Sequence, residues 1–223
     1  MSPTPQTDFA SRTLADIAAT LPGATALFRE EKLDFCCGGK VSLAEAMAAR
    51  QKDPASLATR LAALEAAAKP GDGPEDTDGL IDMILTRFHE THRREVPELV
   101  KLARRVEAVH RDVASVPVGL ADLLQHIGAE LESHMQKEEQ ILFPMMRSGG
   151  HPMIEGPISV MLVEHDDHGA NLRKLEALTN DFMPPAEACT TWRALYAGAR
   201  KLTDDVMEHI HTENNILFPR FTS

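Results

Sequence analysis

The stretch His134-Met-Gln-Lys-Glu-Glu-Gln-Ile-Leu-Phe-Pro144 has a counterpart in His209-Ile-His-Thr-Glu-Asn-Asn-Ile-Leu-Phe-Pro219. Both read H-x-x-x-E-x-x-I-L-F-P. In an α-helix, residues four apart lie above one another on one face, so each copy presents an imidazole beside a carboxylate. Such a pair is costly to bury unless its charge is compensated, which a metal ion would do. The repeat therefore predicts two ligand-bearing helices, each with apolar residues for packing and a proline that ends it.

The duplication extends upstream, where His89-Glu-Thr-His92 precedes the first copy and His165-Asp-Asp-His168 precedes the second. Two half-repeats predict four helices whose ligands project into the middle of a bundle. The predicted metal ligands are His89, His134, Glu138, His165, His209 and Glu213. Each carboxylate has two oxygens and can therefore span two ions. A set of four imidazoles and two carboxylates suits a pair of first-row transition metals better than one structural zinc.

Packing is the alternative explanation of the repeat. It accounts well for Ile-Leu-Phe-Pro, but it gives no reason to repeat two polar residue types in register within an apolar stripe. We therefore favour the metal site.

Composition limits the class of protein. The 223 residues suggest one or two domains, and 43% hydrophobic with 26% charged residues is ordinary for a soluble globular protein. A net charge of -11 argues against non-specific binding to nucleic acid or to an anionic membrane. We expect neither a transmembrane helix nor a secretory signal, and three cysteines make no disulfide framework, so a cytoplasmic location is expected.

The periodic segments, rich in Ala and Leu, predict an all-α fold with two domains. After a disordered start (1–8), a small helical domain covers 8–68, with helices beginning at Thr13, Ala24, Ser42 and Pro54. A polar linker of Pro, Gly and acidic residues covers 69–78. A four-helix bundle covers 79–223, with helices near 78–113, 118–147, 156–180 and 185–217.

Acidic residues near the ligands are candidates for holding the imidazole rings. Metal-bound imidazoles usually donate their second N–H to a carboxylate or carbonyl. Glu130 and Asp205 each lie one turn before a predicted His ligand, and Glu164 is a weaker candidate. A solvated acidic face explains each of them about equally well.

The remaining histidines divide by position. His110 lies about 30 Å beyond His89 on a straight helix, too far to share one site unless the helix reverses at Pro97. His92 and His168 recur in both halves, and a role in the pocket and a solvated position stay equally open. We expect surface or loop positions for the others, which are His126, His151 and His211.

Cys36 and Cys37, followed by two glycines, lie in a predicted loop and suggest an exposed tip for redox or metal-handling chemistry. Lys40 close by would favour a thiolate. Two small buried residues are the alternative, which we favour less. Cys189 stands alone and is expected to pack structurally.

These motifs together resemble the iron-sulfur cluster repair di-iron family, whose members are hemerythrin-like. The resemblance covers nearly the whole chain and rests on the following stretches: Asp34-Phe-Cys-Cys-Gly-Gly-Lys40, Ser133-His-Met-Gln-Lys-Glu-Glu-Gln-Ile-Leu-Phe-Pro144, Gly156-Pro-Ile-Ser-Val-Met161, Pro184-Pro-Ala-Glu-Ala-Cys-Thr-Thr-Trp192 and Glu213-Asn-Asn-Ile-Leu-Phe-Pro219.

The resemblance implies a hemerythrin-like bundle that holds a non-haem di-iron centre with an oxo bridge. Glu138 and Glu213 would bridge the two irons, and the four histidines would be terminal ligands. It implies repair of iron-sulfur clusters damaged by nitric oxide or peroxide, with damaged or apo iron-sulfur proteins as partners. Cys36 and Cys37 would serve redox or iron transfer, and His110 is a position at which the family commonly has histidine.

We read the repair role as donation of iron. Reduction of nitric oxide at the di-iron site and reversible binding of oxygen or nitric oxide are the two alternatives. The vicinal thiols, which a simple carrier does not need, favour repair. The sequence leaves open a homodimer, the client proteins, the reductant, and manganese or zinc in place of iron.

Overall fold

The computed structural model describes residues 8–67 and 76–222, and the regular structure of these residues is helical, as predicted. The predicted disordered start, 1–8, and the predicted linker, 69–78, lie mostly outside the described residues. By its contacts the chain divides into two compact units, residues 1–74 together with 210–223, and residues 75–209. This division does not test the domain boundaries expected from the sequence, which stay a prediction.

Residues 8–67, the N-terminal part of the first unit, contain four short helices, α1 (Leu14–Thr20), α2 (Ala24–Glu30), α3 (Leu43–Ala48) and α4 (Pro54–Ala67). Side-chain hydrogen bonds cap the N-termini of α1 and α3, and at α1 the side chain of Thr13 accepts from the backbone N–H of Asp16. Ser42 and Glu45 form the predicted capping box, in which each side chain bonds the backbone N–H of the other residue. Buried apolar side chains from these helices and the loop after α2 form the core, including Leu14, Ile17, Phe28, Phe35 and Leu61.

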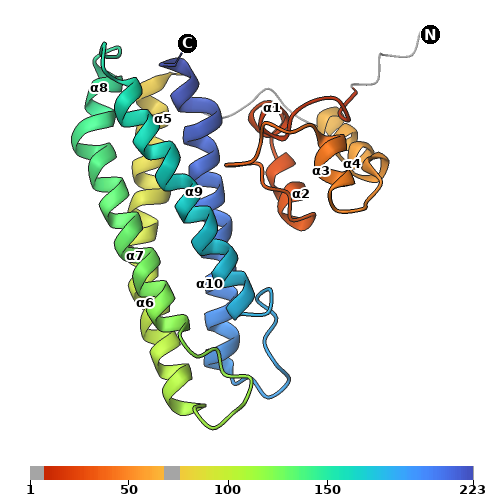
Figure 1. The fold of residues 1–223 in the computed structure, drawn as a ribbon, viewed down its shortest axis with the longest axis vertical. Helices are drawn as coiled ribbons and strands as arrows, with labels where there is room; N and C mark the ends of the chain where they lie inside the picture. The colour runs from red at the N-terminus through yellow and green to blue at the C-terminus, as the bar shows by residue number, and fades with distance from the viewer. Residues whose placement is uncertain (1–7, 68–75, 223) are drawn as a thin grey trace. The chain divides into compact units, whose positions relative to one another are not determined.

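The bundle is built from four long helical columns (Figure 1). Their segments in chain order are α5 (Thr77–Met83), η1 (Ile84–His89) and α6 (Glu90–Val109); α7 (Leu120–Lys137), η2 (Glu138–Leu142) and α8 (Phe143–Arg147); α9 (Glu155–Leu178); and α10 (Thr190–Thr212), η3 (Glu213–Leu217) and η4 (Phe218–Arg220).

Two expected boundaries were wrong. The last column begins at Thr190 rather than at Pro185, because Asn180, Asp181 and Phe182 take a left-handed backbone and turns follow before the helix starts. Pro144 does not end its helix, because α8 continues through it to Arg147.

Three of the columns widen into a π-helical turn at a predicted ligand. His89 ends η1, while Glu138 begins η2 and Glu213 begins η3. The two later turns are alike, since the N–H of Phe143 bonds the carbonyl of Glu138 and that of Phe218 bonds the carbonyl of Glu213. Isolated π-turns inside α-helices occur often at functional sites. The duplicated motif therefore encodes a duplicated backbone irregularity.

Close helix packing surrounds Pro97, which lies inside α6 without ending it. A Cβ on Gly128 of α7 would come within 2.8 Å of Val96 Cγ1, and one on Gly198 of α10 within 2.6 Å of Leu99 Cδ2. The two glycines thus allow α7 and α10 to approach α6. None of the described helices combines the length and apolar character needed to cross a bilayer.

Candidate metal centre

The six side chains predicted as metal ligands lie together and are buried, each with at most 1% of its surface exposed. They form two overlapping groups whose ligand atoms lie within 4.8 Å of one another. One group is His89, Glu138, His209 and Glu213; the other is His134, Glu138, His165 and Glu213. Both carboxylates belong to both groups, so the arrangement suits two ions that share them.

The imidazole nitrogens are spaced as ligands of a common ion would be. His89 Nε2 lies 3.2 Å from His209 Nε2, and His165 Nε2 lies 3.1 Å from His134 Nε2. Two nitrogens bound to one metal at about 2.1 Å are about 3 Å apart when their bonds are near a right angle. The donor set therefore fits a pair of transition-metal ions, each with two imidazoles.

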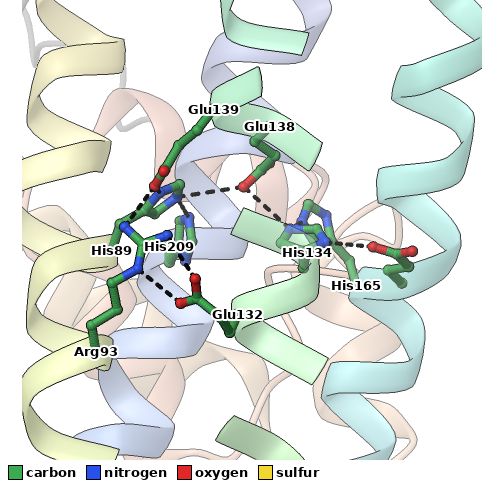
Figure 2. A network of polar contacts seen from close by, with 9 residues as sticks. His89, Arg93, Glu132, His134, Glu138, Glu139, His165 and His209 are labelled. Carbon is green, nitrogen blue, oxygen red and sulfur yellow. Dashed lines mark hydrogen bonds and ion pairs between the residues drawn. The ribbon is translucent and has the colours of Figure 1, made fainter. Parts of the chain in front are cut away.

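Glu138 lies between the two histidine pairs, as Figure 2 shows. Its Oε2 is 3.4 Å from His89 Nε2 and 3.5 Å from His134 Nε2, which places one oxygen almost midway between the two groups. A carboxylate in this position can bind both ions at once. Its burial without a cation would carry a large desolvation cost.

Carboxylates from neighbouring helices hold the outer nitrogens of two rings. His89 Nδ1 donates to Glu139 Oε1 at 2.7 Å, and His134 Nδ1 donates to Glu164 Oε2 at 2.9 Å. Each bond fixes the tautomer in which the lone pair of Nε2 points into the site. Glu164 was predicted for this role from the sequence, whereas Glu139 was not.

Cations outside the site keep these two carboxylates ionised. Burial acts to raise the pKa of Glu139, but hydrogen bonds from Arg93 and His89 outweigh it and hold that pKa below its usual value. For Glu164, burial is likewise outweighed by the bonds from Lys137 and His134, which lower its pKa. A charged carboxylate is the stronger acceptor for an imidazole N–H.

The structure does not give Glu130 and Asp205 the role predicted for them. Glu130 is exposed, and no hydrogen bond or ion pair of its side chain occurs among residues 8–67 and 76–222. Asp205 is buried but bonds Arg87 at 2.6 Å and Lys201 at 2.7 Å. Helical side chains lean towards the helix N-terminus, so an acid one turn before a histidine leans away from it.

His92 and His168 are buried beside the ligands, which decides between the two positions left open for them. The ring of His92 lies 5.4 Å from that of His209, and the ring of His168 lies 5.0 Å from that of His134. Burial lowers the pKa of His92 to about 2 and that of His168 to about 3. Both imidazoles are therefore neutral at physiological pH.

The other predicted histidines lie apart from the site. His126 and His151 are exposed, as expected. His110 caps the C-terminus of α6 and lies 3.2 Å from Cys189 Sγ. His211 was expected at the surface but is 2% exposed, because its ring meets Phe35 edge-on and Asn215 donates to its Nδ1.

The cysteines also differ from expectation. Cys189, expected to pack structurally, is exposed. Hydrogen bonds from the backbone of Trp192, at the start of α10, and from His110 lower its pKa. Cys36, expected at an exposed tip, is buried, and Cys37 is partly exposed.

The chain is similar to known proteins over nearly its whole length. Residues 80–221 match the hemerythrin HHE cation binding domain, and residues 10–65 match a domain of unknown function, DUF542. The chain is 50% identical to the iron-sulfur cluster repair protein YtfE of Dickeya chrysanthemi, over 95% of this chain and 97% of the relative. It belongs to the iron-sulfur cluster repair protein family.

Other members of the iron-sulfur cluster repair family show a similar degree of likeness. A probable iron-sulfur cluster repair protein of Haemophilus influenzae is 45% identical, and YtfE of Citrobacter koseri is 48% identical. Both alignments cover 95% of this chain and 97% of the relative. Cys36 and Cys37 lie in the region that matches DUF542, and the His/Glu repeat lies in the region that matches the hemerythrin domain.

Proposed function

We propose that the protein donates iron to damaged iron-sulfur clusters and holds it as a pair of ions in the bundle. His89 and His209 would hold one ion and His134 and His165 the other, and Glu138 and Glu213 would be shared between the two ions, with an oxo group expected in the oxidised form. The observation that carries the proposal is the pair of overlapping four-residue groups that share both carboxylates. The bound pair supplies ferrous iron and its redox chemistry.

The donor set suits a protein that gives iron away. Imidazole and carboxylate bind ferrous iron without the soft thiolates that iron-sulfur sites offer, so a thiolate-rich client can compete for the ion. The π-turns at His89, Glu138 and Glu213 place three of the ligands where the helix is least regular. Neutral His92 and His168 keep further positive charge away from the site.

The setting follows from this role. We propose that the clients are apo or damaged iron-sulfur proteins in the cytoplasm, and that nitric oxide or oxidative stress creates the demand. The relatives' names as repair proteins support this proposal. We also propose domains at 8–68 and 79–223 with a linker at 69–78. Cys36 and Cys37 act in redox or iron transfer.

Transfer of iron under reducing conditions tests the function. The reduced, iron-loaded chain is mixed without oxygen with a ferredoxin whose cluster has lost one iron, in the presence of a chelator that traps free ferrous ion. We expect the cluster absorption to recover while the chain loses iron. A Glu138→Gln variant should restore little. Recovery no faster than with a ferrous salt under the same chelator would contradict donation.

A further inference from the structure

Asp34, Cys36 and Cys37, in the loop between α2 and α3, form a second group of potential metal ligands within the first unit of the chain. One ligand atom from each lies within 4.8 Å of the other two. The two sulfurs are 3.7 Å apart, and Cys36 Sγ is 3.5 Å from Asp34 Oδ1. The group shares no residue with the centre in the bundle.

These spacings match three corners of a tetrahedron around one ion. Two thiolates bound at about 2.3 Å to a tetrahedral ion have their sulfurs about 3.8 Å apart. A carboxylate oxygen bound at about 2.1 Å lies about 3.6 Å from each sulfur. Three protein ligands leave the fourth corner open, as in sites where the metal takes up an exchangeable ligand.

A disulfide between the two cysteines is a poor alternative. Adjacent Cα atoms are about 3.8 Å apart across a trans peptide, whereas disulfide-bonded residues usually have theirs at least about 4.4 Å apart. The hydrogen bond with Cys37, together with burial, raises the pKa of Cys36 well above its usual value. A protonated thiol is a weak nucleophile, but a metal ion can displace its proton.

The loop is held in this shape by bonds to its backbone. Asp34 Oδ1 accepts the N–H groups of Cys37 and Gly38, each at 3.0 Å. The side chain of Asn214 donates to the carbonyl of Cys36 at 3.0 Å, and that of Asn215 donates to the carbonyl of Phe35 at 3.2 Å. The sulfurs are thus oriented before any ion arrives, which lowers the cost of binding.

We propose that Asp34, Cys36 and Cys37 form a second cation site that takes a single ferrous ion and presents its open position to a thiolate of the client. Binding replaces the two thiol protons by one divalent ion, with release of two protons and no change of oxidation state. Two thiolates and one carboxylate make a softer ligand set than the imidazoles and carboxylates of the bundle, and a harder one than the four thiolates of a client. The second site is therefore intermediate between donor and client in ligand type. The identity of the cargo rests on the proposed function, whereas the site itself does not.

Cobalt(II) is a suitable probe because its bonds to thiolates give strong charge-transfer absorption and its bonds to imidazole and carboxylate do not. Titration of the reduced full chain with Co²⁺ should produce these bands. Cys36→Ser and Cys37→Ser should abolish them, and Asp34→Asn should shift the titration to higher Co²⁺. Cys189→Ser, which changes an exposed thiol outside the group, is the matched control and should keep them.

Thermal unfolding of each variant checks that the fold is intact. His134→Ala, which damages the centre in the bundle, should retain the bands, so the result does not depend on the proposed function. Absence of the bands in the natural chain, or their persistence in the double variant Cys36→Ser/Cys37→Ser, would overturn the site. If Cys36→Ser transferred iron to the depleted ferredoxin as well as the natural chain does, the second cation site would have no role in the transfer. Donation of iron by the bundle would not be contradicted by that result.

Discussion

His89 and Glu139, from two different helical columns, are joined by a hydrogen bond of 2.7 Å between Nδ1 and Oε1. The bond turns the other nitrogen of His89 towards Glu138 and His209. Arg93 bonds the same oxygen of Glu139 at 2.8 Å and so holds the carboxylate in place (Figure 2). The position of a predicted ligand thus depends on a residue that is not itself a ligand.

Replacing Glu139 by Gln should weaken metal binding, because the ring of His89 loses its charged acceptor. Loss of such a partner typically reduces metal affinity about 10- to 100-fold. Competition with a chelator measures the effect. Glu130→Gln is the matched control, since Glu130 is an exposed acid near the same part of the bundle, and it should retain full affinity. Equal losses in the two variants would show that the bond does not matter.

Substitution of Glu138 should remove more bound metal than substitution of a terminal histidine. Glu138 belongs to both groups of ligands, whereas His165 belongs to one. We expect Glu138→Gln to lose both ions and His165→Ala to keep one, as measured by elemental analysis after dialysis. Removal of both ions by a chelator should lower the melting temperature of the natural chain, because the metal binds only the folded state. Two ions retained in Glu138→Gln would contradict the bridging role.

Acid should destabilise the metal-free protein from about pH 6.5 downwards. The unfolded chain protonates an ordinary histidine near pH 6.5, whereas the pKa of His92 is about 2 in the folded chain. The stability that neutral His92 contributes is therefore full above pH 6.5. Between the two pKa values it falls by about 1.4 kcal/mol per pH unit as the pH drops.

Denaturant unfolding at about pH 7.5 and about pH 5.5 measures this loss. His92→Gln should reduce the difference between the two values, because glutamine takes up no proton. His126→Gln, at an exposed position, should leave it unchanged. An unaltered pH dependence in His92→Gln would show that His92 is not held neutral by burial.

Gly39→Ala should disturb the loop that carries the cysteines. An added Cβ would lie 2.5 Å from the carbonyl oxygen of Phe35, and a backbone atom cannot move aside as a side chain can. We expect a loss of about 1–3 kcal/mol in unfolding free energy together with weaker Co²⁺ charge-transfer bands. Gly156→Ala, where an added Cβ meets nothing within 4 Å, should be tolerated. Equal stability of the two variants would contradict the close contact.

The sequence was sufficient for features that depend on local spacing. The four columns, the capping box of Ser42 and the burial of the repeated histidines and glutamates follow from helical periodicity within a single segment. The duplication was the decisive signal, because a polar residue that recurs in register within an apolar stripe has few structural explanations.

Features that depend on two segments were missed. Glu139 reaches His89 across two columns, so only the relative register of those columns reveals the pair. Glu130 fits the expected spacing along one helix, but its side chain leans towards the helix N-terminus and so away from His134. His211 is buried because Phe35, far away in sequence, packs against it. The π-turns could not be predicted, because the spacing of the apolar and polar residues in these segments is also compatible with an ordinary α-helix.

The most direct test of the central claim is the location of the metal in crystals of the iron-loaded chain, by anomalous diffraction at the iron absorption edge. We predict two peaks in the bundle, one bonded to His89 and His209 and one to His134 and His165, with Glu138 and Glu213 bonded to both. A single peak, or two peaks away from these six side chains, would contradict it.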